Sequence, residues 1–208
     1  MSDRLPGMSE RHLLRYPLSF VVLDGAGSSR VRGMALVLTC GLSFSGKSTL
    51  AAGLSSALDA ELLSLDRINE ERGLNGGQGI PAEEWATTNR IAHERAGVLL
   101  AAGRRVVVDD TGSPRFIRNE WRATASAAGA PFVLVWVQVS PELQRQRVLA
   151  NRAKQVRPDV TDAVLLEHGA SFEAPEEDED PLAIDATSTS DPATIAAIVE
   201  AIEAAAVR

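Results

Sequence analysis

The chain has 208 residues, a length typical of one domain that leaves little room for a second one. Its formal net charge of −7 argues against a broad nucleic-acid-binding surface, which normally carries excess positive charge. No apolar run approaches the roughly 20 residues of a membrane helix, and the single cysteine, Cys40, excludes an intrachain disulfide. We therefore expect a soluble, cytoplasmic protein that does not partner a membrane and for which nucleic acid is possible but not favoured.

Residues 1–33 differ in pattern from the rest of the chain. The apolar run LSFVVLD (18–24) is followed by the turn-like segment GAGSSRVRG (25–33). We expect an N-terminal extension over 1–33 that adds an extra edge strand, and a main domain over 34–208. An alternative stays open, in which Met34 is the functional start and the extension is dispensable.

From Met34 onward, short apolar runs alternate with helical segments. The sequence predicts strands at 34–40, 61–65, 105–110, 131–139 and 181–185. It predicts helices at 47–58, 81–103, 113–129, 140–153 and 191–206. Almost wholly apolar strands separated by helices are typical of a parallel sheet that is covered on both faces. The expected fold is α/β, with a mainly parallel five-stranded sheet between two helical layers.

Local chemistry supports these boundaries. Ser113-Pro114, Ser140-Pro141 and Asp191-Pro192 each place a capping oxygen before a proline at the first helical position. Gly103 and Gly129 stand where two helices should end, because glycine adopts the left-handed conformation that closes a helix at little cost.

The segment CGLSFSGKST contains the full pattern G-x-x-x-x-G-K-[ST] between a predicted strand and a predicted helix. In this pattern the glycines let backbone N–H groups point at phosphate oxygens, and the helix adds its positive dipole end. Lys47 is expected to reach the β- and γ-phosphates of a nucleotide, and Ser48 to bind Mg²⁺. The predicted nucleotide-binding residues are Gly41, Leu42, Ser43, Phe44, Ser45, Gly46, Lys47, Ser48 and Thr49.

Three aspartates follow predicted strands at the sheet edge where ligands of open α/β sheets bind. Asp66 could accept the proton of an attacking hydroxyl, or it could cap a helix or pair with Arg67. Asp109 and Asp110 end the third strand, where a carboxylate commonly supports Mg²⁺. We favour Asp109 for the metal and Asp110 with Thr111 for the acceptor, and the reverse assignment of the two aspartates stays open.

Arginines on two predicted helices are further candidates. Arg147 and Arg152 lie on or just after a predicted helix that continues into the candidate lid AKQVRPDV, and an arginine brought in by a closing lid would stabilise a transferring phosphoryl group. Arg118 could bind an anionic acceptor. For all three the alternative is a solvated helix face. The acidic run EAPEEDED (173–180) is expected to be a solvated loop.

The ordered motifs resemble those of a known group, the small P-loop kinases related to the kinase domain of polynucleotide 5′-kinase, chloramphenicol phosphotransferase and the zeta-toxin-like kinases. The motifs are GLSFSGKST, LSLDRINEE, VVVDDTGSPRFIRNEWR, VQVSPELQRQRVLANRA and FEAPEEDEDPLAID. The resemblance implies a P-loop NTPase fold like that of adenylate kinase with a short lid, and ATP and Mg²⁺ as cofactors. It also implies Asp66 as general base, lid arginines at Arg147 and Arg152, and an acceptor-side pair at Asp110 and Thr111.

Two departures from the family pattern concern the acceptor. Polynucleotide kinases carry an arginine shortly after the catalytic aspartate, where this chain has Asn69, and often an asparagine where it has Gly112. Our leading hypothesis is an ATP-dependent phosphotransferase that acts on a hydroxyl of a small molecule, such as a metabolite, nucleoside or antibiotic. The alternatives are a polynucleotide 5′-hydroxyl kinase and a non-catalytic ATP-binding regulatory module.

Overall fold

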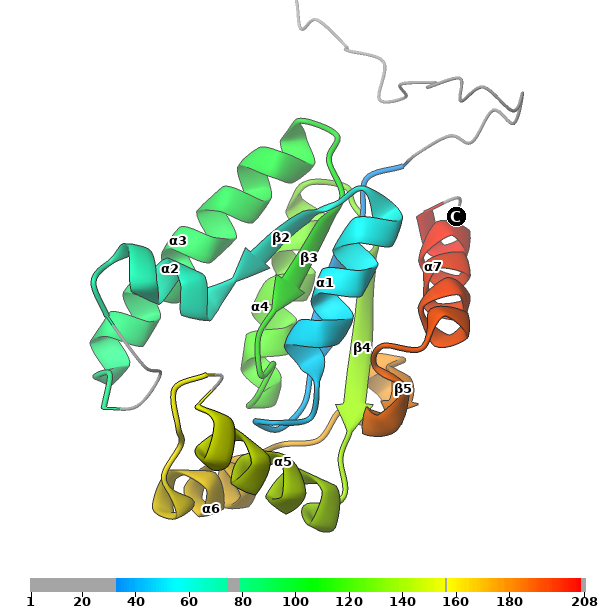
Figure 1. Cartoon of the computed structure of the whole chain (residues 1–208). Helices are drawn as coiled ribbons and strands as arrows, with labels where there is room; N and C mark the ends of the chain where they lie inside the picture. Colours follow the sequence, from blue (N-terminus) through cyan, green and yellow to red (C-terminus); the bar gives the residue numbers. More distant parts are fainter. Residues whose placement is uncertain (1–32, 75–78, 156, 207–208) are drawn as a thin grey trace, which may run out of the picture. The chain divides into compact units, whose positions relative to one another are not determined.

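Five short apolar segments form one sheet, in which the strand order is β2-β3-β1-β4-β5 (Figure 1). All four neighbouring pairs are parallel. The strands are β1 (Leu36–Cys40), β2 (Glu61–Ser64), β3 (Val106–Asp109), β4 (Phe132–Gln138) and β5 (Leu182–Asp185). The predicted α/β fold with a parallel five-stranded sheet is therefore confirmed.

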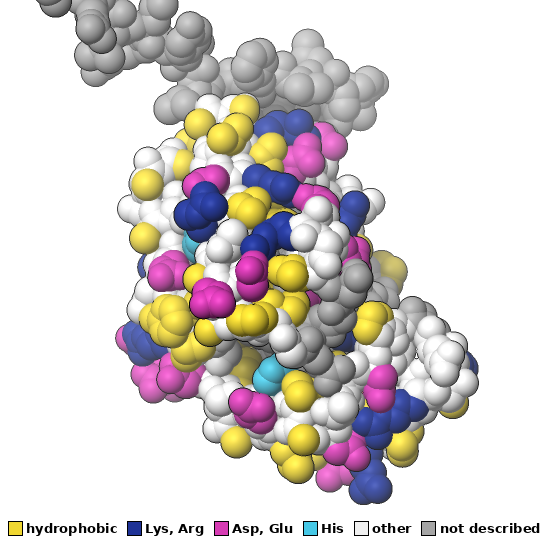
Figure 2. Space-filling view, turned by 90° about the vertical axis from the view of Figure 1, so that its left-hand side faces the viewer, with side chains coloured by type: hydrophobic (Ala, Val, Ile, Leu, Met, Phe, Trp, Pro, Cys, Tyr) yellow, Lys and Arg dark blue, Asp and Glu magenta, His cyan; other side chains and the backbone are white. Residues whose placement is uncertain are grey.

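The structure is a computed structural model that describes residues 33–74, 79–155 and 157–206. The extra strand expected at 18–24 lies outside the described residues. On the face shown in Figure 2, acidic and basic side chains are interspersed. None of the helices in the described ranges is both long enough and apolar enough to span a membrane.

Helices cover both faces of the sheet (Figure 1). They are α1 (Lys47–Leu58), α2 (Leu65–Glu71), α3 (Ala82–Ala101), α4 (Arg115–Ala127), α5 (Pro141–Lys154), α6 (Asp162–Ser171) and α7 (Pro192–Ala206). Because successive strand side chains point to opposite faces, Leu36 and Leu38 pack with α3 and α4, while Val37 packs with α1 and α7. Two buried clusters therefore enclose β1, whose five residues are all buried.

Two of these helices, α2 and α6, were not predicted. Helix α2 follows β2 directly, and the Ser64 side chain caps it by accepting from the backbone N–H of Arg67. Because Ser64 lies within the run that was predicted as a strand (61–65), the strand pattern obscures the capping signal at the start of this helix. Helix α6 has no buried residue, so its hydrophobic pattern is weak.

Most of the predicted helix ends are confirmed. The Ser140 side chain and the Asp191 carboxylate each accept a backbone N–H from the first turn of the helix that follows. Gly103 and Gly129 have φ angles of +75° and +68°, the left-handed conformation expected after α3 and α4.

The predicted cap at Ser113 is wrong. Its hydroxyl accepts from the backbone N–H of Glu173 at 2.9 Å. The Glu173 carboxylate in turn accepts from the backbone N–H of Arg115, in the first turn of α4, at 2.7 Å. A carboxylate that is distant in sequence therefore caps α4 in place of the local serine.

A buried ion pair joins α4 to the acidic run and corrects two predictions. Arg118 donates from Nε and Nη2 to the Glu179 carboxylate at 2.6 and 2.7 Å, and the side chains are 0% and 1% exposed. Its Nη1 donates to the carbonyl oxygens of Gly112 and Glu173, both at 2.8 Å. The acidic run is thus not wholly solvated. Arg118 cannot bind an acceptor as predicted, because it is fully buried and its nitrogens are used inside the protein.

Glu179→Gln should lower the free energy of unfolding by about 3–5 kcal/mol, because it leaves the buried Arg118 guanidinium without its counter-charge. Asp178→Asn is the matched control, since Asp178 pairs with Arg115 on the exposed side of the same short helix (Glu177–Glu179). The control should change stability far less. Urea denaturation of both variants measures the difference, and equal losses would contradict a dominant role for the buried pair.

The same pair predicts a pH dependence. Hydrogen bonds from Arg118 hold the pKa of Glu179 below its ordinary value of 4.5. A carboxyl group with a lowered folded-state pKa stabilises the protein above its unfolded pKa, and this contribution is lost as the pH falls through the folded pKa. The stability difference between the wild type and Glu179→Gln should therefore shrink below about pH 4.5. Urea denaturation across a pH series tests this, and a constant difference would refute it.

Candidate functional site

The predicted phosphate loop connects β1 to α1, and two glycines make its path possible. Gly41 has a φ of +146°, and a Cβ atom there would lie 2.5 Å from the carbonyl oxygen of Val137. Gly46 has a φ of +103°, and its Cβ would lie 2.8 Å from Oγ1 of Thr189. Both positions exclude a side chain, so the loop is held close to β4 and to the segment after β5.

Lys47 begins α1 and is buried inside the loop. Its Nζ donates to the carbonyl oxygen of Leu42 at 3.0 Å. Burial lowers the pKa of Lys47, while the charges of Asp109 and Asp110 act in the opposite direction. The loop therefore holds an ammonium group beside two carboxylates.

Those two carboxylates have different surroundings. Burial raises the pKa of Asp109, and the Lys47 charge and a hydrogen bond from the Ser48 hydroxyl lower it. Burial also raises the pKa of Asp110, whose Oδ1 accepts from the backbone N–H of Thr111 at 2.6 Å. Asp109 thus adjoins the hydroxyl of the loop serine, whereas Asp110 folds back on its own turn.

Asp66 lies in the first turn of α2, just past the end of β2, and is exposed. Together with Lys47, Ser48 and Asp109 it lines a cavity of about 630 Å³. The charge of Asp66 also raises the pKa of Asp109, so the two carboxylates lie within electrostatic reach of each other. The cavity therefore brings together the loop, Asp66, Asp109, Asp110 and Thr111.

The two predicted lid arginines do not line this cavity. Arg147 donates to the carbonyl oxygens of Phe44, Ser45 and Ala186 at 3.0, 2.6 and 2.8 Å. It braces the phosphate loop against the segment after β5, and its guanidinium is occupied by backbone. A catalytic role for Arg147 is therefore not supported by its position.

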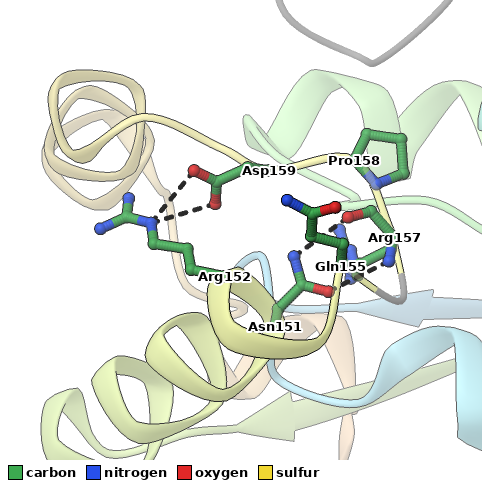
Figure 3. A pocket seen from close by; sticks show the side chains of 6 residues that line it. All are labelled: Asn151, Arg152, Gln155, Arg157, Pro158 and Asp159. Carbon is green, nitrogen blue, oxygen red and sulfur yellow. Dashed lines mark hydrogen bonds and ion pairs between the residues drawn. The ribbon is translucent and has the colours of Figure 1, made fainter.

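Arg152 does not line this cavity, and its guanidinium bonds to Asp159 in the segment between α5 and α6 (Figure 3). It pairs with Asp159 at 3.1 Å and with Asp162 at 2.7 Å. Nη2 of Arg152 also donates to the carbonyl oxygen of Val160. These bonds tie the lid segment together, so Arg152 is placed to shape the lid and does not reach the phosphate loop.

Arg157, which we did not single out from the sequence, does line the cavity. Its guanidinium carbon lies 4.3 Å from the centre of the Phe44 ring, and its charge lowers the pKa values of Lys47 and Asp109. The Asn151 side chain accepts from the backbone N–H of Arg157 and donates to its carbonyl oxygen, both at 3.1 Å (Figure 3). Its position could have been noticed in the sequence, because Arg157 is the one arginine within the candidate lid AKQVRPDV.

Arg157 also separates the main cavity from a smaller hollow. This second cavity, of about 500 Å³, lies over the end of α5. Figure 3 shows its lining residues, which are Asn151, Arg152, Gln155, Arg157, Pro158 and Asp159. Arg157 and Pro158 line both cavities, so the lid segment forms a wall between them.

Comparisons with known proteins agree with this fold. A family model described as AAA domain matches residues 36–175, a range that includes the loop, Asp66, Asp109 and Arg157. The Mycobacterium tuberculosis APS kinase in complex with AMPPNP and APS superposes with a TM-score of 0.60 at 20% identity, over 81% of this chain and 98% of that one. No curated protein sequence matches the chain significantly.

Two further solved structures are similar. A gluconokinase from Sinorhizobium meliloti has a TM-score of 0.57 at 19% identity, over 84% of this chain and 92% of that one. Chaetomium thermophilum Kti12 in complex with ADP-AlF3 has a TM-score of 0.64 at 18% identity, over 82% of this chain and 98% of that one. At these identities the likeness establishes the fold, which is that of the P-loop kinases. Because the family model matches more than half of this chain, the chain belongs to the AAA domain family.

Proposed function

We propose that the protein is an ATP- and Mg²⁺-dependent kinase that transfers the γ-phosphate to a hydroxyl group of a small molecule. The observation that carries this proposal is the cavity of about 630 Å³ that joins the phosphate loop to Asp66. Its volume falls in the range of roughly 300–1,000 Å³ that is usual for small-molecule sites. The cavity therefore has space for a donor phosphate and an acceptor hydroxyl side by side.

The donor half consists of the loop and the start of α1. The loop amides and the N-terminus of α1 bind the phosphates of ATP, and Lys47 leaves its carbonyl partner to reach the β- and γ-phosphates. The similar APS kinase and Kti12 structures contain AMPPNP and ADP-AlF3, which supports the proposal that this fold binds a nucleotide here too.

The residues at the loop suit a magnesium ion. Ser48 and Asp109 offer a hydroxyl and a carboxylate, the hard oxygen donors that Mg²⁺ prefers. Within the described ranges, no group of three or more His, Cys, Asp or Glu side chains could hold a metal by itself. This fits Mg²⁺, which takes few protein oxygens and completes its shell with phosphate and water. When bound, the ion would offset the charge of the phosphates.

Asp66 is the general base in this proposal. It takes the proton of the acceptor hydroxyl, whose oxygen forms a bond to the γ-phosphorus while the bond to the β–γ bridging oxygen breaks and ADP leaves. Lys47 and Arg157 stabilise the charge on the transferring group. We assign Asp110 and Thr111, which line the same cavity, to the binding of the acceptor.

Asp66→Asn should lower the transfer rate by about 10²–10⁴-fold, because it removes the base, while ATP affinity stays nearly unchanged. The matched control is Glu71→Gln, on the same helix, because Glu71 pairs with Arg95 at 2.7 Å and does not line the cavity. Transfer of radiolabelled γ-phosphate to pools of hydroxyl-bearing metabolites, antibiotics and 5′-hydroxyl oligonucleotides measures the rate, and calorimetry measures ATP binding.

Full activity of Asp66→Asn would contradict the assignment of the base. Tight ATP binding by the wild type without transfer to any pool would contradict kinase activity and support a regulatory ATP-binding module. Transfer to oligonucleotides alone would replace the small-molecule acceptor with a polynucleotide.

Arg157→Ala should lower kcat on the order of 10²-fold, because it removes a cation from the cavity wall. The matched control is Arg145→Ala, on α5, whose side chain is exposed and does not line the cavity. The control should keep kcat within a few-fold of the wild type. Steady-state kinetics of both variants test the assignment, and an equal loss in the two variants would contradict it.

A further inference from the structure

The part of the cavity beyond Asp66 has walls that differ from those of the donor half. It is bounded by α2, the segment after it, the first turns of α3 and α4, and α6. Its apolar side chains are Leu65, Leu74, Trp85, Pro114, Ile117 and Val164. An acceptor that enters here must therefore carry an apolar or aromatic part to cover this surface.

The lysine and arginine that line the cavity among the described residues, Lys47 and Arg157, belong to the phosphate loop and the lid, and Asp109 and Asp110 lie beside Lys47. His168 of α6 lines the cavity as well. On α2, both Asp66 and Glu70 line the cavity and are exposed. Because they are four residues apart, they share one face of the helix, separated by a rise of about 6 Å. The acceptor end thus presents a second carboxylate beside the proposed base.

Three arginines on the neighbouring helices are engaged elsewhere, and Arg67 of α2 does not line the cavity. Arg72, at the end of α2, donates to the Glu84 carbonyl oxygen at 2.7 Å and to Thr88 Oγ1 at 2.6 Å, and it also pairs with the Glu84 carboxylate. On α4, Arg115 pairs with carboxylates of the acidic run, and Arg118 is buried with Glu179. An anionic acceptor group would therefore meet carboxylates at this end of the cavity, without a described arginine placed to neutralise it.

Uncharged polar groups complete the wall. Asn69 is 2% exposed and lines the cavity; its Oδ1 accepts from Thr88 at 2.5 Å, and its Nδ2 has no partner among the described residues. Asn89 also lines the cavity, and its Oδ1 likewise has no partner there. Amides of this kind suit neutral oxygen and nitrogen atoms of a ligand and leave charge recognition to Glu70.

We propose that the acceptor is an amine-bearing alcohol with an apolar or aromatic body, an inference that rests on the proposed kinase function. Its hydroxyl lies at Asp66, its body packs on Trp85 and Ile117, and its ammonium group pairs with Glu70. The spacing of the two carboxylates on α2 requires the hydroxyl and the amine to be only a few bonds apart. Glu70 is thus a specificity-determining residue that excludes phosphorylated, sulfated and carboxylated alcohols.

Three compounds with one skeleton test this inference: phenylalaninol, phenylpropanediol and phenyllactate. They share a phenylpropyl body and a hydroxyl group, and they differ in carrying a cationic, neutral or anionic group beside it. Binding is measured by calorimetry to the Asp66→Asn protein saturated with AMPPNP, in which no transfer can occur. Phenylalaninol should bind about tenfold or more tightly than phenyllactate, with the diol between them. Equal or tighter binding of phenyllactate, or binding of none of the three, would overturn the inference.

Glu70→Gln, made in the same Asp66→Asn background, should weaken the binding of phenylalaninol about tenfold and leave that of the diol unchanged. Glu71→Gln is the control one position away, since its carboxylate faces Arg95. A preference that survives in Glu70→Gln would refute the role of Glu70. Because these experiments measure binding without turnover, their outcome is separate from that of the kinase proposal, which fails only if the wild type transfers phosphate to no acceptor.

Discussion

The parallel pairing of β3 with its two neighbours is the constraint on which the site depends. In this register Asp109 lies opposite Thr39 of β1 on one side and opposite Ser64 of β2 on the other. The strand that leads into the phosphate loop and the strand that leads to Asp66 therefore end at the same level as Asp109. A slip of one residue in β3 would turn Asp109 to the opposite face of the sheet and remove it from the loop serine.

Arginine has three different uses around this sheet edge. Arg118 and Arg147 are fixed by carbonyl and carboxylate oxygens of the protein, because a guanidinium with five donors can join several chain segments at once. Arg152 joins the end of α5 to Asp159 and Asp162, at the other end of the lid segment. Arg157 instead lies against the Phe44 ring at the edge of the cavity. The same residue type thus serves packing, lid structure and the site itself.

The proposed reaction draws on an uneven distribution of charge along the cavity. Lys47, Arg157 and helix-terminal amides gather where phosphates would bind, with Asp109 and Asp110 beside Lys47, whereas Asp66 and Glu70 line the opposite end. Such a division favours a negatively charged donor and a neutral or positively charged acceptor in a single orientation, since the reverse placement would bring like charges together. Specificity would then come from the charges on α2 as much as from the shape of the apolar wall.

The sequence by itself determined the α/β class, all five strands and the identity of the phosphate loop. These features rest on local patterns: apolar runs of strand length, prolines after capping residues, and a glycine–lysine spacing that few other structures require. Only the tertiary structure decided the roles of the arginines and of Glu179. Whether such a side chain is buried, and which group it pairs with, depends on segments that are far apart in the sequence, such as those of Arg118 and Glu179. It also revealed α2, whose capping residue Ser64 lies within the predicted strand 61–65, and the contribution of Arg157 and Glu70 to one cavity. Local pattern specifies an element, whereas the function of a charged side chain depends on which distant groups share its space.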